Sequence, residues 1–437
     1  MKKILTIIIS LIIIAIVAVI LMASLNICPP KGPWPTAPWC QVNFTVYQYE
    51  VDVQPMPLSQ IKAVNMYDTW GRNYNMNMFE TTWSNIDSSF DRVQKLGAQE
   101  VYVHDFDRAV YQGNPDYKSL DYQLVDEVFT NDMRDESISE EDLKKLVVAA
   151  HSRNLKLGIK RNLAFVNIGK FIISGITGDI SADVAKDYQT FNESHSEAWI
   201  KDYFNKWQQR LVSKAKLYQN AGVDIMSISP TFQDPTFSGQ EELANKLWRD
   251  LIIAVKKEFK GQIMAEVNVY GFNDGNNGKE DWTKYDFYKE ADIAEIRVYK
   301  ILEKYQTKIG NQAENKEQAM EAMLNDFNNK ALASKLKLSI FFAPSSYENS
   351  ILAGPVEYLD IKNPAINSLK KDYQEQVDSF NYFFKSLANK NQIVRINVGN
   401  FAWDDALDPE VPALVSLSAG FRNKPAEQVV QAWYNKK

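Results

Sequence analysis

Several motifs that identify common classes of enzyme are missing from this chain. Its three histidines, His104, His151 and His195, form no HxH or HExxH spacing, which gives a zinc site little support. No GxSxG elbow is present, so a serine nucleophile of that type is not indicated. No GxGxxG fingerprint follows the first expected strand, which disfavours dinucleotide binding. We therefore expect neither a metal nor a cofactor.

An excess of positive charge is also missing. The chain has 49 Lys and Arg against 55 Asp and Glu, a formal net charge of -6, and no basic stripe that would contact phosphates. Nucleic acid is therefore not an expected partner. Aromatic residues, in contrast, are abundant, with 10 Trp, 21 Tyr and 22 Phe. We expect most of them in the core, while some on loops would stack on the apolar faces of sugar rings.

The first 24 residues have the pattern of a membrane anchor. Lys2 and Lys3 precede the largely apolar run Ile4–Ala23, which contains Thr6 and Ser10. About 20 apolar residues can span a bilayer as a helix, whereas a cleaved signal peptide usually has an apolar region of about 7–15. By the positive-inside rule, we expect a single-pass cell-membrane protein with the remainder of the chain outside. A long, cleaved signal peptide is the alternative, and it would make the protein secreted.

Residues 25–57 form a proline-rich stalk that contains both cysteines of the chain, in the segment CPPKGPWPTAPWC. Outside the membrane, Cys28 and Cys40 most simply form a disulfide with each other. Two reactive thiols or a metal-binding pair is the weaker alternative, because no histidine or further cysteine lies near. Cys28 follows Ile27 instead of a small residue, which argues against a lipid anchor at this cysteine.

Residues 58–437 read as eight units of a strand followed by a helix. The expected strands are Ile61–Met66, Glu100–His104, Leu155–Lys160, Val223–Ser229, Gln262–Val269, Ile293–Tyr299, Leu336–Phe342 and Ile393–Val398. The clearest helices are Trp83–Leu96, one opened by Ser139, Ser196–Asn220, Gln240–Phe259 and Pro425–Tyr434. Regular alternation indicates a parallel sheet, and eight units favour closure into a (β/α)8 TIM barrel of the α/β class. An open, doubly wound sheet is the competing interpretation.

Four segments of this region carry a resemblance to a known family. DLKKLVVAAHSRNLKLGIKRN (142–162) resembles the second helix and third strand of TIM-barrel glycoside hydrolases of the retaining superfamily called clan A. SEAWIKDYFNKWQQRLVSKAKLYQNAGVDIMSIS and LWRDLIIAVKKEFKGQI are similar to the surroundings of strand four in its endo-β-mannanase-like members, and AGFRNKPAEQVVQAWY is similar to their closing helix. The resemblance covers most of Ile61–Tyr434, and it implies a barrel that hydrolyses a β-linked polysaccharide or oligosaccharide.

The chain departs from this family at the two positions that carry its chemistry. Family members place an acid/base Glu at the end of strand four and a nucleophilic Glu at the end of strand seven. Here these positions read SISPTF, with Thr231, and SIFFAPSSY, with Phe342 or Ala343. None of these side chains ionises, whereas retaining hydrolysis needs two carboxylates about 5–5.5 Å apart. The usual pair is therefore missing.

Other carboxylates lie on strands five and six. Period-two alternation places Glu266 and Asn268 on one face of strand five, and Glu295, Arg297 and Tyr299 on one face of strand six. One interpretation is a buried layer of ion pairs that fills the barrel, because buried charges are normally paired. The other is a carboxylate of shifted pKa, positioned for proton transfer. Tyr299 matches a tyrosine common at the end of the family's sixth strand, which supports an inward orientation.

Further candidate ligand-binding residues follow the ends of other strands: Trp70, Asp105, Asp107, Lys160, Arg161, Asp234, Tyr347, Glu348, Trp403 and Asp404. Asp105 and Asp107 fit helix capping or loop solvation as well as substrate binding. One of Lys160 and Arg161 is expected to point into the barrel mouth, where it would pair with Asp105 or hold a ligand. Trp403 lies where family members often have a Trp beneath a sugar ring.

Two functional hypotheses follow. The first is a membrane-anchored extracellular glycoside hydrolase whose displaced catalytic acids come from Glu266, Glu295 and Asp234, with Asp105 and Glu348 as further candidates. The second is a catalytically inactive barrel that binds carbohydrate at the cell surface. Exposed carboxylates facing each other would favour hydrolysis, whereas acids held in salt bridges would favour binding. Oligomeric state has no signal in the sequence.

Overall fold

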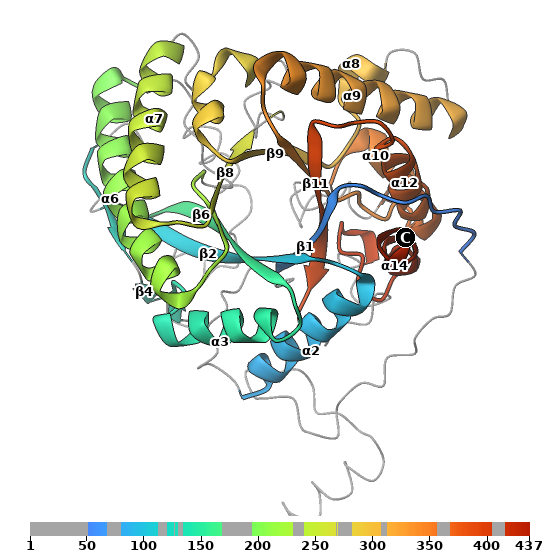
Figure 1. The fold of residues 1–437 in the computed structure, drawn as a ribbon, viewed down its shortest axis with the longest axis horizontal. Helices are drawn as coiled ribbons and strands as arrows, with labels where there is room; N and C mark the ends of the chain where they lie inside the picture. Colours follow the sequence, from blue (N-terminus) through green and yellow to red (C-terminus); the bar gives the residue numbers. More distant parts are fainter. Residues whose placement is uncertain are drawn as a thin grey trace, which may run out of the picture.

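Eight parallel strands form a closed ring in the computed structural model of the protein (Figure 1). The structure describes residues 51–67, 80–111, 120–125, 127–129, 134–167, 195–229, 240–267, 269, 282–306, 313–355, 368–403 and 416–437. The strands of the ring are β1 (Ile61–Tyr67), β2 (Glu100–Tyr111), β6 (Lys156–Asn167), β7 (Ile225–Ser227), β8 (Gln262–Val267), β9 (Ile293–Val298), β10 (Leu338–Phe342) and β11 (Ile393–Ala402).

Closure of the ring rests on two parallel pairings of the first strand. β1 pairs with β11 on one side, as in Ile61 with Arg395, and with β2 on the other, as in Ala63 with Glu100. The other neighbours in the ring follow chain order. The prediction of a closed (β/α)8 barrel is confirmed, and the open sheet is wrong.

The long helices surround the ring of strands in Figure 1. They are α2 (Glu80–Leu96), α3 (Glu140–His151), α6 (Glu197–Ala221), α7 (Glu241–Glu258), α9 (Ala313–Ser334), α12 (Tyr373–Lys385) and α14 (Pro425–Asn435). Shorter elements lie in the connections: β3 (Tyr122–Val125), β4 (Glu127–Phe129), β5 (Arg134–Glu136), η2 (Trp282–Lys284), η3 (Asp286–Glu290), α8 (Glu303–Gln306) and α10 (Ser350–Ala353). The main core lies between the barrel wall and these helices, and a smaller one lies inside the barrel.

Local signals explain where the best-predicted helices begin and end. The hydroxyl of Ser139 accepts from the backbone N–H of Asp142 at 3.1 Å, which caps α3 at its first turn. The Ser196 hydroxyl caps α6 in the same way, through the N–H of Trp199 at 3.2 Å. α6 ends at Gly222, whose φ of 87° is in the left-handed region that glycine adopts without strain.

Strands two and three are longer than the sequence suggested. β2 was expected to end at His104 and β6 at Lys160, but the two strands pair in register as far as Tyr111 and Asn167. The last residues of β2 also pair with the antiparallel strand β3. The HDFD segment resembles a loop because acidic residues are rare in strands, yet here it forms part of an extended barrel wall.

The expected anchor, the stalk, Cys28 and Cys40 lie outside the described residues. Within the described part of the chain, no helix combines the length and apolarity that crossing a membrane requires.

Candidate functional site

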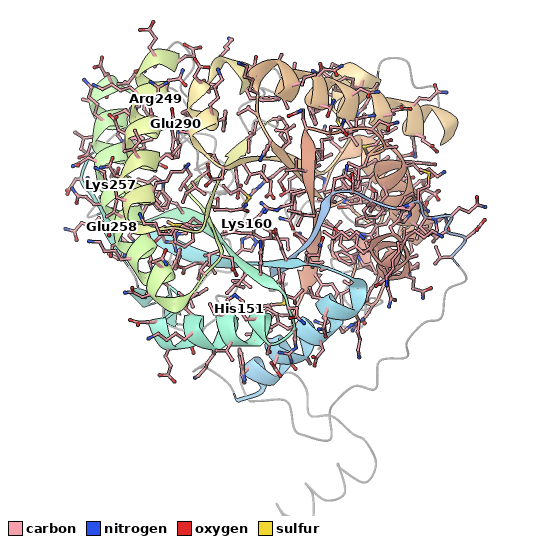
Figure 2. The ribbon with its side chains drawn as sticks, viewed as in Figure 1. His151, Lys160, Arg249, Lys257, Glu258 and Glu290 are labelled. Carbon is pink, nitrogen blue, oxygen red and sulfur yellow. The ribbon has the colours of Figure 1, made fainter. Side chains whose placement is uncertain are left out.

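Four charged side chains meet inside the barrel, and we call them the interior cluster: Lys160, Glu266, Glu295 and Arg297. Glu266 and Glu295 are register partners on the neighbouring strands β8 and β9, and Arg297 lies two residues after Glu295. Lys160 comes from β6, and its label lies within the ring of strands in Figure 2. The expected inward face of strands five and six is thus present, and its two glutamates do meet.

Glu295 is the deeper of the two glutamates, with no exposed surface. Its carboxylate forms a close ion pair with Lys160 and also accepts from the Ser339 hydroxyl at 2.9 Å and the Asn397 amide at 3.0 Å. Burial alone would raise the pKa of Glu295, but the charge and hydrogen bond of Lys160, aided by Asn397, lower this pKa overall. Glu295 is therefore a structural anion of the barrel.

Glu266 is the penultimate residue of β8, near the end of the barrel where the parallel strands terminate, which we call the mouth. It is 7% exposed and forms a close ion pair with Arg297, which is 8% exposed. Lys160 lies 4.0 Å away, and the Ser227 hydroxyl lies at 3.5 Å. Burial raises the pKa of Glu266, against the opposing charges of Arg297 and Lys160. The cluster thus contains two glutamates whose pKa values move in opposite directions.

An aromatic pair covers the cluster. The Phe341 ring of β10 lies 4.5 Å from the Lys160 ammonium, a cation–π contact. Tyr299, at the end of β9, meets the Phe341 ring edge-on, with centroids 5.5 Å apart. Tyr299 remains partly exposed, and its expected inward orientation is confirmed by this contact.

The seventh strand supplies no acid to the interior. Phe342 points outward and stacks on Phe383 of α12 with centroids 4.2 Å apart, so Phe342 does not occupy the position of the family's nucleophile. Phe341 and Ala343 are the inward residues there, and they pack together. Gly399 of β11 makes room for the ring, because a Cβ at this position would lie 2.4 Å from Phe341.

Three polar side chains from other strands are joined by hydrogen bonds. The His104 ring is 2.9 Å from the Asn65 side-chain oxygen, and the Asn65 amide donates to Asn400 at 3.3 Å. These residues belong to β2, β1 and β11, and His104 and Asn400 are partly exposed. They can donate to and accept from hydroxyl groups, which are the polar groups of a neutral sugar.

Asp105, Asp107 and Arg161 are not at the mouth, which corrects the expected placement of these candidates. All three have no exposed surface, and Arg161 forms close ion pairs with both carboxylates on the outer side of the barrel wall. Arg210 of α6 pairs with Asp107 at 2.7 Å, and Tyr218 of α6 donates to Asp105 at 2.6 Å. We call these five residues the outer cluster; they join the barrel wall to α6. Lys160 does point inward as one of the expected pair, but toward the glutamates instead of Asp105.

Three further candidates are also placed by structural contacts. Tyr347 is 4% exposed and donates its hydroxyl to the Gly354 carbonyl at 2.6 Å. Trp403 is 3% exposed within the main core, where it does not form an open platform for a sugar ring. Glu348 is exposed and pairs with Lys370 at 3.6 Å. The remaining candidates lie outside the described residues: Trp70, Thr231, Asp234, Asn268 and Asp404.

The sequence reasoning missed several partners of the cluster. Ser339 and Phe341 alternate along β10, and Arg395 and Asn397 alternate along β11, so the period-two argument used for strands five and six would also have identified them. Arg395 pairs with Glu100 at 2.7 Å and donates to Gln262 at 2.7 Å. This second group closes the other end of the barrel interior.

Comparison with known proteins gives matches at the level of structure. No protein-family model matches the chain, and no curated protein matches its sequence. The β-mannanase of glycoside hydrolase family GH113 from Alicyclobacillus acidocaldarius superposes with a TM-score of 0.56 at 13% identity, over 86% of this chain and 97% of that one. A GH113 β-1,4-mannanase gives 0.56 at 16% identity, over 87% and 100%. The glycoside hydrolase family 5 mannosidase from Rhizomucor miehei gives 0.52 at 11%, over 86% and 93%. The chain therefore has the (β/α)8 fold of these clan A mannanases and mannosidases.

Proposed function

We propose that this chain is a carbohydrate-binding TIM barrel that holds a β-linked saccharide at the mouth without cleaving it. One observation carries the proposal: both interior glutamates are held in ion pairs, and Glu295, with three donors and no exposed surface, cannot reach a ligand. The inward residues of the seventh strand, Phe341 and Ala343, supply no replacement nucleophile. Retaining hydrolysis requires two carboxylates that both reach the sugar.

The ligand class follows from the side chains that face the mouth. His104 and Asn400 offer donors and acceptors to hydroxyl groups, and Tyr299, the residue after β9, adds a partly exposed ring. Parallel barrels bind their ligands at this end, where loops from all strands converge. The structural similarity to mannanases and mannosidases, one of them solved in complex with ManMIm, adds support.

Hydrolysis is the second candidate, and the position of Glu266 favours it. Burial raises the pKa of this carboxyl, as a general acid requires, and Glu266 retains a small exposed surface toward the mouth. Asp234 or Asp404, which lie outside the described residues, would be its partner. In this alternative the enzyme cleaves a β-linked polysaccharide through carboxylates that differ from the family's usual pair.

We also propose that the barrel lies outside the cell, fixed to the membrane by Ile4–Ala23. The length of this run and the lysines before it support the proposal. Both candidate functions require contact with an extracellular polysaccharide, which is consistent with such an anchor.

The test is a measurement of retention and release on the same polysaccharides. The full-length chain, purified in detergent, would be applied to insoluble mannan, cellulose and xylan, and both bound protein and new reducing ends would be quantified. We expect retention without release, and retention weaker by about tenfold in Tyr299→Ala, equivalent to ~1.4 kcal/mol. Tyr382→Ala is the matched control, because it makes the same change at a partly buried tyrosine of the outer helix α12.

Two results would contradict the binding proposal. Release of reducing ends that Glu266→Gln abolishes would establish the hydrolase instead. Absence of both retention and release on every polymer, with correctly folded protein, would reject both functions.

A further inference from the structure

Lys160 occupies the centre of the interior cluster and is 1% exposed. Its ammonium forms the close ion pair with Glu295 and lies 4.0 Å from the nearer oxygen of Glu266. The rings of Phe341 and Tyr102 approach the same nitrogen, at 4.5 and 5.9 Å from their centroids. The cation is thus held by one carboxylate, covered by aromatic rings, and near a second carboxylate.

We propose that Lys160 is a positioning residue that keeps Glu295 ionised, so that Glu266 is the glutamate of the interior cluster that gains and loses a proton. The inference deepens the proposed function and rests on it in one respect: Glu266 is the member of the pair that faces the proposed ligand site.

The unequal contacts of the two glutamates carry this proposal. Glu295 has three donors directed at it, from Lys160, Ser339 and Asn397, and protonation would sacrifice at least one of them. A buried carboxylate that accepts several hydrogen bonds and contacts a cation is strongly held in its charged form.

The charged form of Glu266 is stabilised less strongly than that of Glu295. The titratable and charged groups that face it are Lys160 from β6, and Glu295 and Arg297 from β9. Lys160 is engaged more closely by Glu295, and the negative charge of Glu295 itself opposes ionisation of Glu266. Ser227 of β7 adds only a long contact, at 3.5 Å. Arg297 is therefore the principal group that stabilises the charged form of Glu266.

The proposal can be tested without a saccharide, by following carboxyl protonation in the full-length protein with pH-dependent difference infrared spectroscopy. We expect protonated-carboxyl absorption above the pH of an ordinary glutamate, of which the Glu266 component disappears in Glu266→Gln while that of Glu100, whose pKa burial also raises, remains. In Lys160→Met a further such component should appear, since Glu295 has lost its cation. Lys160→Arg should restore the wild-type titration. Elevated absorption that Glu266→Gln leaves undiminished, or an unchanged titration in Lys160→Met, would overturn the proposal.

A second variant keeps the proposal testable if Lys160→Met does not fold. In Glu295→Gln, the negative charge beside Glu266 is removed, and Glu266 becomes the carboxylate of the interior cluster that pairs with Lys160. The Glu266 band should therefore move to lower pH. The double variant Lys160→Met/Glu295→Gln removes one charge of each sign and should return the titration toward that of the wild type. A Glu266 band that does not move in Glu295→Gln contradicts the inference. Because no ligand is involved, failure of saccharide binding in the retention assay would reject the proposed function and leave this result standing.

Discussion

Replacing Asp105 by alanine removes the carboxylate at the centre of the outer cluster. Its two oxygens accept from the Tyr218 hydroxyl at 2.6 Å and from the backbone N–H of Ile138 at 2.9 Å. The same group forms a close ion pair with Arg161 and lies 3.6 Å from the ammonium of Lys214. The substitution therefore removes an acceptor from two neutral donors and two cations. Water cannot take its place, because the carboxylate of Asp105 has no exposed surface.

The expected loss of stability is large. Removing one partner of a buried ion pair costs about 3–5 kcal/mol, and a buried donor left without an acceptor costs about 1–3 kcal/mol. These contributions overlap, because Asp107 still pairs with Arg161, so we expect a total of about 3–5 kcal/mol for Asp105→Ala. At roughly 2 °C per kcal/mol for a domain of this size, Tm should fall by about 6–10 °C.

The assay is thermal and urea unfolding followed by far-ultraviolet circular dichroism. Asp286→Ala is the control, since Asp286 pairs with Lys289 on the surface at 2.5 Å and exposed pairs contribute about 0–1 kcal/mol. If Asp105→Ala unfolds within about 1 kcal/mol of the wild type, the structural role argued for Asp105 is refuted. If the same stable variant also loses retention on polysaccharide, Asp105 binds ligand, as the sequence first suggested.

The pH dependence of a second variant, Asp105→Asn, checks the electrostatic part of the argument. Burial alone would raise the pKa of Asp105, but Arg161 and Lys214 outweigh it, and the pKa lies well below that of an ordinary aspartate. A lowered pKa in the folded state means that the stabilisation is present above the unfolded value, about 3.9, and is lost as the pH falls toward the folded value. The stability difference between wild type and Asp105→Asn should therefore be constant near neutral pH and shrink below about pH 4.

Three further outcomes are expected from the packing. Gly399→Ala should destabilise the fold by about 1–3 kcal/mol, because the added methyl would lie 2.4 Å from the Phe341 ring, and Phe341→Leu in the same chain should recover part of the loss in urea unfolding. Ser196→Ala should cost about 1 kcal/mol by removing the cap on the N–H of Trp199, a loss that Ser196→Asp should avoid. Trp403→Ala should cost about 3–5 kcal/mol in the same assay while leaving polysaccharide retention of the folded fraction intact, since this ring is 3% exposed.

The positions of the barrel strands were predictable because each strand contains a short apolar run and lies between helices with recognisable ends. The capping serines at 139 and 196 and the glycine at 222 set these ends locally, without help from distant residues. Alternation placed Glu266 on one face of strand five, and Glu295 and Arg297 on one face of strand six, and the resemblance at Tyr299 indicated that this face is inward. These two signals together grouped the three residues before any contact was known.

The partners of the charged residues were not predictable in the same way. Arg161 and Asp105 are 56 residues apart in sequence, and Lys160 and Glu295 are 135 apart, so no local pattern links them. The neighbours Lys160 and Arg161 point to opposite sides of the barrel wall. Which of the two points inward depends on how the strand pairs in the barrel and not on the local sequence. HDFD resembled a loop because carboxylates normally need contact with water. In the folded protein, Arg161 and Arg210 pair with the carboxylate of Asp107 in place of water.

The balance of charges inside the barrel explains why an acid on strand seven would be unfavourable here. The interior cluster has two cations and two anions, each cation lying against a carboxylate. Phe341, at the inward seventh-strand position, contributes no charge and covers the ammonium at 4.5 Å. A carboxylate there would compete with Glu295 for Lys160 and leave a third anion in a region without solvent, at a cost of several kcal/mol. An acid on strand seven is therefore incompatible with two charged glutamates in this barrel. Introducing one would require Glu266 or Glu295 to become neutral.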